Sequence, residues 1–246
     1  MKKSKIQDNH ELAGKVALIT GATQGIGFAV ARALAARGCN LAITGRDKPR
    51  LKQAAKELIE IGVEVLPCVC DVRDPESVDS LAVAIEGRFH RVDFLINNAG
   101  IAHESSTVEK LDYEAWKEVI DTNLNGLFLV THTILPLIKS GGAIVNNLST
   151  AAKRIFPGSS AYNASKHGAL GFTDTLREEL REKGIRVIAV LPGATDTAIW
   201  DTLWPDAPRK KMMRPETVAT AVVNALLLPD DGTLEELSVR PSAGTL

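Results

Sequence analysis

A tyrosine and a lysine four residues apart are the first candidates for chemistry in this sequence. Tyr162 and Lys166 lie in a segment with helical spacing, so their side chains share one face of a helix and can approach one another. A lysine ammonium group favours the phenolate form of a nearby tyrosine and lowers its pKa from about 10. Such a tyrosine can donate or accept a proton near neutral pH. Taken alone, the pair is equally typical of a buried tyrosine beside a surface lysine.

A glycine-rich turn follows the first apolar run of the chain. It consists of Thr20, Gly21, Ala22, Thr23, Gln24, Gly25, Ile26 and Gly27, and a segment with helical periodicity follows. Glycines reach unusual backbone angles and let a phosphate approach the backbone. The N-terminus of the helix adds free N–H groups and a partial positive charge. The turn therefore indicates a dinucleotide site, with a purely structural turn as the alternative.

Short apolar runs alternate with helical segments along the whole chain. The pattern predicts strands at 16–20, 40–44, 63–69, 94–96, 143–148, 186–191 and 236–239. It predicts helices at 26–37, 50–61, 76–89, 161–183 and 215–228, with another long helical stretch after the fourth strand. Apolar strands between amphipathic helices indicate a parallel sheet covered on both faces. We therefore predict one doubly wound α/β domain over 12–246, preceded by a flexible tail over 1–11.

Further motifs lie where the predicted strands end or in the middle helix: Asn97-Asn98-Ala99-Gly100, Asn123, Ser149 and Pro192-Gly193. Together with the glycine-rich turn and the Tyr162/Lys166 pair, they resemble the motif set of the short-chain dehydrogenase/reductase family. The likeness is to the compact, non-extended branch and its 3-oxoacyl reductases, and it covers about Lys15 to Val239. It implies a Rossmann-type sheet of about seven strands, a nicotinamide cofactor, and hydride transfer between a carbonyl and an alcohol.

The resemblance implies a role for each motif residue. Tyr162 becomes the general acid or base, Lys166 lowers its pKa, Ser149 orients the carbonyl oxygen, and Asn123 takes part in a proton relay. Ser149 by itself is typical of a cap or turn, and Asn123 of a helix kink. The residues expected to contact the cofactor are Gly21, Thr23, Gln24, Gly25, Ile26, Gly27, Arg46, Asp71, Val72, Asn98, Ala99, Gly100, Tyr162, Lys166, Pro192, Gly193, Thr195 and Thr197.

The end of the second strand bears on the choice of cofactor. Dinucleotide folds that select NAD carry an acidic residue there, whereas a nearby arginine accommodates the 2′-phosphate of NADP. Gly45 occupies the acid position and Arg46 follows it, which favours NADP(H) over NAD(H). Gln24 stands where many NADP-binding relatives carry a basic residue. Asp47 competes for the ribose unless it is the N-cap of the next helix.

The segment 198–214 is predicted to be a substrate loop. A single helical turn places Trp200 and Trp204 on one face, where they either cover an apolar substrate or pack the loop onto the domain. Four cations either meet an acidic substrate or form a solvated cluster: Arg209, Lys210, Lys211 and Arg214. The C-terminal residues lack the glycine-rich valine-aspartate ending frequent in acyl-carrier reductases, which weakens a role in fatty-acid synthesis.

Composition disfavours several other classes of function. The chain has 29 Lys and Arg against 30 Asp and Glu, and a net charge of -1 gives no broad attraction for nucleic acid or anionic lipid. No apolar run approaches a membrane span and no secretion signal is evident, so a cytoplasmic location is expected. The histidines and cysteines lack metal-ligand spacing, and no metal is expected.

Three functions remain after these exclusions. The favoured one is an NADPH-dependent oxidoreductase for a small carbonyl or alcohol substrate, which by resemblance forms a homodimer or homotetramer. A non-catalytic NADP(H)-binding sensor or scaffold is the second, although such relatives are expected to lose the tyrosine or the lysine. The third is an NAD-dependent alcohol dehydrogenase or epimerase of the same family; epimerases of the extended branch have a different glycine spacing and a longer chain.

Overall fold

A single parallel sheet of seven strands organises the computed structural model, which describes residues 11–229 and 231–244. The strand order is β3-β2-β1-β4-β5-β6-β7, and neighbouring strands are parallel throughout. The strands are β1 (Val16–Ile19), β2 (Asn40–Gly45), β3 (Val65–Val69), β4 (Val92–Asn97), β5 (Ile138–Asn147), β6 (Arg186–Pro192) and β7 (Glu236–Val239). The predicted doubly wound, Rossmann-type sheet is confirmed. Of the predicted tail, residues 1–10 lie outside the described residues.

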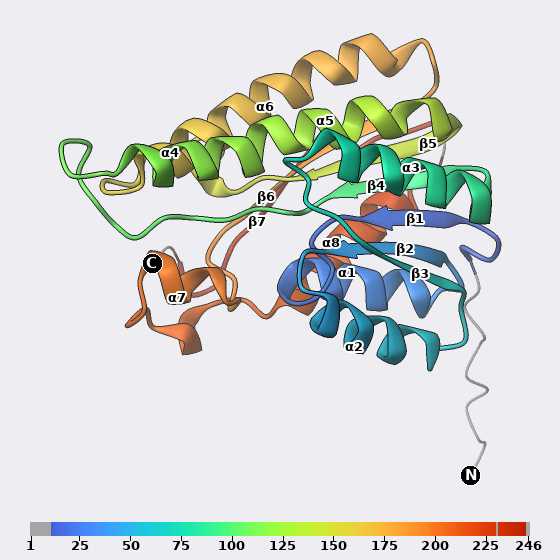
Figure 1. Cartoon of the computed structure of the whole chain (residues 1–246), viewed down its shortest axis with the longest axis horizontal. Helices are drawn as coiled ribbons and strands as arrows, with labels where there is room; N and C mark the ends of the chain where they lie inside the picture. Colours follow the sequence, from blue (N-terminus) through green and yellow to red (C-terminus); the bar gives the residue numbers. More distant parts are fainter. Residues whose placement is uncertain (1–10, 230, 245–246) are drawn as a thin grey trace.

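Helices cover both faces of the sheet (Figure 1). One face packs against α1 (Gly25–Ala35), α2 (Lys48–Ile59) and α8 (Pro215–Leu226). The other packs against α3 (Pro75–Phe89), α4 (Tyr113–Ile120), α5 (Gly126–Ile134) and α6 (Ser160–Arg181). A short helix, α7 (Ile199–Leu203), lies beyond the carboxyl edge of the sheet. Within the described ranges no helix is long and apolar enough to cross a membrane.

The central strands are mainly apolar because each of their two faces enters a core. Ile19 and Ile43 belong to the core under α1, α2 and α8, whereas Leu18 and Ala42 belong to the core on the opposite side. Alternate residues of a strand point to opposite faces, so a doubly covered sheet needs apolar side chains at every position. This requirement explains why the strands could be located from sequence alone.

The long helical stretch after β4 is interrupted. A π-helical turn, Asp121–Asn125, separates α4 from α5 and holds Asn123, the residue expected at a kink. At its end a Cβ on Gly126 would lie 2.8 Å from Cγ2 of Val72, so the helix approaches the segment after β3 too closely for any side chain there. The π-turn therefore places Asn123 while keeping the helix against the sheet.

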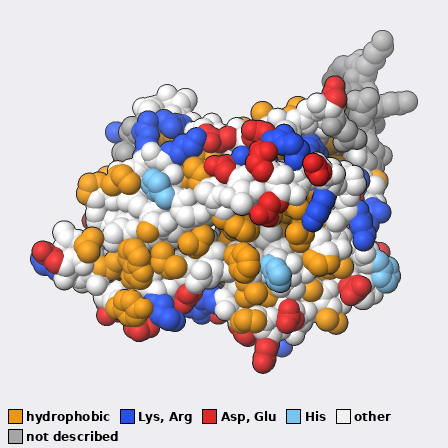
Figure 2. Space-filling model, turned by 90° about the horizontal axis from the view of Figure 1, so that it is seen from above, with side chains coloured by type: hydrophobic (Ala, Val, Ile, Leu, Met, Phe, Trp, Pro, Cys, Tyr) orange, Lys and Arg blue, Asp and Glu red, His pale blue; other side chains and the backbone are white. Residues whose placement is uncertain are grey.

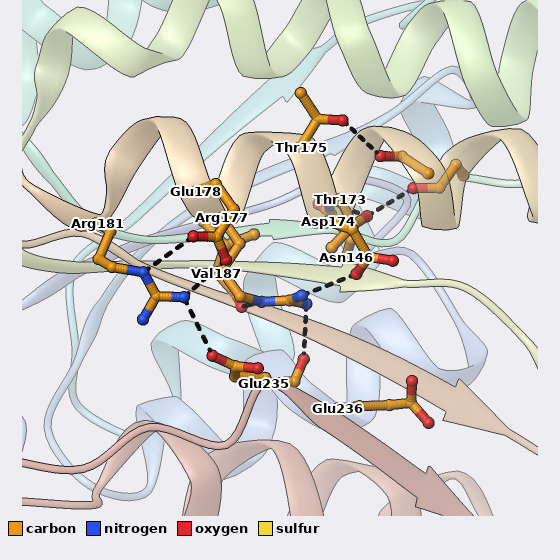
Figure 3. Close-up of polar contacts among 12 residues, drawn as sticks. Asn146, Thr173, Asp174, Thr175, Arg177, Glu178, Arg181, Val187, Glu235 and Glu236 are labelled. Carbon is orange, nitrogen blue, oxygen red and sulfur yellow. Dashed lines mark hydrogen bonds and ion pairs between the residues drawn. The ribbon is translucent and has the colours of Figure 1, made fainter.

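A buried polar network ties the centre of the sheet to α5 and α6. The Asn97 side-chain amide donates to Oγ1 of Thr131 at 3.0 Å and to Oδ1 of Asn146 at 2.9 Å. The Asn146 amide in turn donates to Oγ1 of Thr173 at 2.9 Å (Figure 3). Because Asn146 is fully buried, losing a partner would leave an unpaired polar group in the core. The network therefore fixes α6 relative to β5.

A second set of contacts braces the outer edge of the sheet (Figure 3). The Arg177 guanidinium donates to the carbonyl oxygens of Val187 at 3.0 Å and Glu235 at 2.9 Å. Arg181 pairs with the carboxylates of Glu178 and Glu235. These bonds hold the start of β7 against α6 and β6, although β7 has a neighbouring strand on one side only.

Candidate active site

The residues predicted for the site meet at the carboxyl edge of the sheet, where the strand order reverses between β1 and β4. A cavity of about 950 Å³ opens there. Every predicted site residue lines it except Gly27 and Asn123. These two lie behind the wall, where they support residues that do line the cavity. The structure therefore brings nearly all of the predicted residues to one cavity, because parallel strands bring their carboxyl ends to one edge.

The glycine-rich turn has the geometry of a phosphate cradle. Gly21 and Gly25 adopt positive φ angles of 63° and 57°, which favour glycine. A Cβ at Gly27 would lie 2.3 Å from Nδ2 of Asn98, so a side chain there would displace the turn. The Gln24 side chain does not cap α1, which leaves the N–H groups of the first turn available to an anion. These residues fit a dinucleotide pyrophosphate.

Asn98 braces this turn from the neighbouring strand. Its side-chain amide donates to the carbonyl oxygens of Thr20 and Gly21, both at 3.0 Å. Asn147 holds Asn98 in turn, because its own amide donates to Oδ1 of Asn98 at 2.8 Å. The carbonyl oxygen of Asn147 also accepts a hydrogen bond from Nζ of Lys166 at 3.3 Å. Asn147 thus links the turn to the lysine.

Asn147 was missed by the sequence analysis. The available signal was an amide side chain at the last position of β5, directly after a buried run of five residues. A buried amide requires hydrogen-bond partners, and here the partners come from residues far away in sequence. We interpret Asn147 as a positioning residue.

Tyr162 and Lys166 lie one turn apart on α6 and face the same cavity. Nζ of Lys166 is 5.6 Å from the centre of the Tyr162 ring. Burial lowers the pKa of Lys166 to about 8. Burial also raises the pKa of Tyr162, and a hydrogen bond with Ser149 opposes that rise. The pKa of Tyr162 thus shifts in the opposite direction to the one predicted from sequence, because the largest cause is the loss of water around the phenol.

Ser149 caps a turn and also lines the cavity. Its Oγ accepts a hydrogen bond from the N–H group of Ala151 at 3.0 Å and so caps the 3-10 turn Thr150–Ala152. The same hydroxyl lines the cavity beside Tyr162. The cap fixes the serine backbone at the wall of the cavity.

Asn123 is 2% exposed, and its side chain is fully engaged. Its amide donates to the carbonyl oxygen of Ile101 at 2.9 Å and to Oγ of Ser165 at 3.1 Å. Its Oδ1 accepts from the N–H group of Ile101 at 2.8 Å. Gly100 packs between this amide and the lysine, since a Cβ there would lie 3.3 Å from Oδ1 of Asn123 and 3.6 Å from Nζ of Lys166. The side chain of Asn123 therefore positions the loop after β4.

Cationic side chains gather at the end of the cavity formed by β2 and β3. Arg46 is half exposed and lies 3.9 Å from the Glu118 carboxylate. Arg73, which the sequence analysis did not single out, pairs with Asp71 at 2.6 Å and with Glu118 at 3.3 Å. Its hydrogen bonds lower the pKa of Asp71. Arg46 thus has only one distant ion-pair partner in the described ranges, which leaves its guanidinium accessible to a phosphate.

Two features of the sequence counted against NADP(H): Gln24 in place of a basic residue, and Asp47 as a competitor for the ribose. Asp47 caps α2, because its carboxylate accepts from the N–H group of Arg50 at 2.9 Å, as the capping alternative predicted. The Arg50 guanidinium lies 3.4 Å from Oε1 of Gln24. The sequence analysis missed this cation, since it reaches Gln24 from another helix. A Cβ at Gly45 would lie 2.5 Å from Cγ2 of Thr23, so Thr23 occupies the space that an acidic side chain would need.

The predicted substrate loop is held by internal contacts. Nε1 of Trp200 donates to the carbonyl oxygen of Thr195 at 2.9 Å, whereas Trp204 remains 47% exposed at the mouth of the cavity. The Arg209 guanidinium pairs with Asp196 and Asp201. None of the four loop cations lines the cavity. Trp200 therefore anchors the loop, and Arg209 serves its structure.

A family model for short chain dehydrogenases matches residues 15–208. The chain belongs to this family. It is 37% identical over 241 residues to sulfoacetaldehyde reductase 2 of Chromohalobacter salexigens, with 92% of this chain and 94% of the relative covered. The fold matches an alcohol dehydrogenase of the archaeon Thermococcus sibiricus, complexed with 5-hydroxy-NADP, with a TM-score of 0.88 and 34% identity over 94% of this chain and 98% of that one.

A ketoacyl reductase also matches the fold. The 3-ketoacyl-(acyl-carrier-protein) reductase of Brucella melitensis, complexed with NADH, has a TM-score of 0.84 and 31% identity, with 94% of this chain and 98% of that chain covered. Together these findings confirm a 3-oxoacyl-reductase-like short-chain dehydrogenase. The chain is an NAD(P)-dependent oxidoreductase that acts on CH–OH groups.

Proposed function

We propose that this short-chain dehydrogenase is an NADPH-dependent reductase that converts the carbonyl group of a small molecule to an alcohol, and can run in reverse. The observation that carries the proposal is the convergence of Tyr162, Lys166 and Ser149 on the cavity that also holds the glycine-rich turn. When bound, the nicotinamide supplies the hydride for the carbonyl carbon. A sensor would have no need for a proton donor beside that position.

Each of the three side chains has a distinct part in the reduction. Ser149 donates a hydrogen bond to the carbonyl oxygen and stabilises the negative charge that develops there. Tyr162 donates its proton to the same oxygen, a transfer favoured while the phenol is protonated. Lys166 places a positive charge 5.6 Å from the Tyr162 ring centre and stabilises the phenolate that remains. The raised pKa of Tyr162 keeps the proton in place before transfer.

The preference for NADPH rests on Arg46. Arg46→Ala is expected to weaken NADPH binding by about tenfold, or about 1.4 kcal/mol, and to leave NADH binding within about twofold. The only part of the cofactor that this guanidinium is proposed to contact is the 2′-phosphate, which NADH lacks. Calorimetry with both cofactors measures the two changes directly.

Arg32→Ala provides the control for this prediction. Arg32 is an exposed arginine on α1 that does not line the cavity, so its loss changes the net charge equally. An equal loss of affinity for both cofactors in Arg46→Ala would show that Arg46 supports the fold of the site rather than reading the phosphate.

We also propose that the protein forms a homo-oligomer through the outer face of α5 and α6. Phe128 is 53% exposed and stacks on His132, with Phe172 edge-on at 6.0 Å between ring centres. A Cβ at Gly171 would meet nothing within 4 Å. Hydrophobic side chains gather on the face of the molecule that carries these helices (Figure 2). Such a patch supports a contact between copies.

Phe128→Lys is therefore expected to reduce the assembly to monomers, because a buried unpaired ammonium group opposes the contact. Light scattering after gel filtration gives the mass of each species. Ile59→Lys is the matched control, since Ile59 is also 53% exposed but lies on α2, across the sheet. Dissociation by both variants, or by neither, would contradict the proposed interface.

A cytoplasmic location is also proposed. The three cysteines are free, and burial raises the pKa of Cys39 to about 12 and of Cys68 to about 11. Such thiols stay protonated and require no oxidising compartment. Fractionation of cells that produce the chain tests this location.

A further inference from the structure

Apolar side chains line part of the substrate half of the cavity. Beyond Ser149 and Tyr162, the lining includes Phe156, Leu203 and Trp204. The only carboxylates that line any part of the cavity are Asp71 and Glu118, and both lie at the β2/β3 end, where Arg73 pairs with them. Within the described ranges, the substrate half therefore contains no acidic side chain.

Two arginines line the same cavity without an acidic partner. Arg154 and Arg240 are exposed, and neither guanidinium makes an ion pair or hydrogen bond with any described residue. Arg46, Arg73 and Arg209 differ, since each lies within ion-pair distance of a carboxylate. A guanidinium that no acid of the chain neutralises is available to an anion from solution.

Braced segments carry both arginines. Arg154 follows the 3-10 turn that Ser149 caps, and its neighbour Lys153 pairs with Glu236 of β7. Arg240 directly follows β7, and its Cα would lie 3.4 Å from a Cβ at Gly193. The contacts in Figure 3 hold the start of β7 against α6. The backbones at both positions are thus fixed relative to Ser149, while the side chains remain unpaired.

We infer that the substrate carries an anionic group, a carboxylate or a sulfonate, separated from the reacting carbonyl by a short apolar chain. Arg154 binds this anion, with Arg240 as the second cation at the same cavity. The inference rests on the proposed function, whose substrate class it narrows. A hydrogen bond between a guanidinium and an anionic oxygen is charge-assisted and stronger than one to a neutral group. The net charge of -1 supplies no general attraction, so the preference depends on these residues.

Binding to the enzyme saturated with NADPH tests this inference without turnover. An alcohol cannot be oxidised while the reduced cofactor is bound, so ω-hydroxy carboxylates of increasing chain length form dead-end complexes. Each is titrated by calorimetry beside its ω-hydroxy amide, which has the same shape and no charge. At least one acid is expected to bind about tenfold more tightly than its amide.

The variants assign this preference to a residue. Arg154→Ala is expected to reduce the affinity for the acid to that for the amide, and to leave the amide affinity unchanged. Lys210→Ala removes an equal charge outside the cavity and is expected to change neither. The exposed Arg154 side chain makes no hydrogen bond or ion pair with a described residue that its loss would break, so the variant is expected to fold. The inference would be overturned if no acid bound more tightly than its amide. It would also be overturned if Arg154→Ala still bound the acid more tightly than the amide.

The matching ω-oxo aldehydes separate this inference from the proposed function. Reduction of neutral aldehydes by an enzyme with no preference for acids would overturn the anion site and leave the reductase standing. Preferential binding of the acids without reduction of any aldehyde would support the anion site and contradict the reductase.

Discussion

Tyr162→Phe is expected to lower turnover by about three orders of magnitude while NADPH binds with unchanged affinity. The substitution removes one hydroxyl group and keeps the ring that packs in the cavity, 5.6 Å from Nζ of Lys166. Without the phenol, the site loses the proton donor proposed for the carbonyl oxygen, and only the hydrogen bond proposed from Ser149 remains at that oxygen. The loss therefore appears in kcat, and the binding of NADPH measured by calorimetry stays constant.

The chain offers a matched control for this change. Tyr113 is its only other tyrosine, and its side chain is 70% exposed on α4. Tyr113→Phe is expected to leave kcat within about twofold, since an exposed hydroxyl contributes little outside the site. Equal turnover by Tyr162→Phe and the wild type would remove Tyr162 from the mechanism. Loss of NADPH binding in the same variant would show a structural role instead.

Lys166→Met is expected to lower kcat by about two orders of magnitude. Methionine has a similar length and no charge, so the variant loses the cation beside Tyr162 and the hydrogen bond to the carbonyl oxygen of Asn147. In the wild type the lysine loses its proton as the pH rises through its pKa of about 8. The rate of reduction is therefore expected to fall above pH 8 in the wild type. Methionine has no proton to lose, so the decline that Lys166 causes in the wild type is expected to be absent from the pH profile of Lys166→Met.

Stability distinguishes this catalytic role from a structural one. The folded-state pKa of Lys166 lies below that of the free side chain, so at neutral pH the charged lysine opposes folding. The cost is present below the folded pKa and declines as the pH rises from about 8 towards the unfolded value. Lys166→Met is thus expected to melt no lower than the wild type at neutral pH. The control is Lys183→Met, at an exposed position just after α6. A lower melting temperature with unchanged kcat in Lys166→Met would contradict this account.

The glycine-rich turn and the Tyr162/Lys166 pair could be predicted from sequence because they depend on local chemistry, whereas the roles of Ser149 and Asn123 came from the family resemblance. Gly21 and Gly25 need positive φ angles in a short turn, and Tyr162 and Lys166 are neighbours on one helix. Other site residues depend on contacts between distant segments. Arg50 reaches Gln24 from α2, and Asn147 joins Asn98 to Lys166 across two strands and a helix. Hydrophobic periodicity carries no information about such pairs.

By itself the sequence determined the sheet, its two helical layers and the place where the motifs meet. Apolar strands between amphipathic helices permit few arrangements, and parallel strands end at one edge. Only the tertiary structure decided the charges of the site. The pKa of Tyr162 rises because the fold buries the phenol. Arg209 is engaged by Asp196 and Asp201, while Arg154 remains unpaired. Burial and pairing of charges depend on the neighbours that folding supplies, and sequence spacing does not contain them.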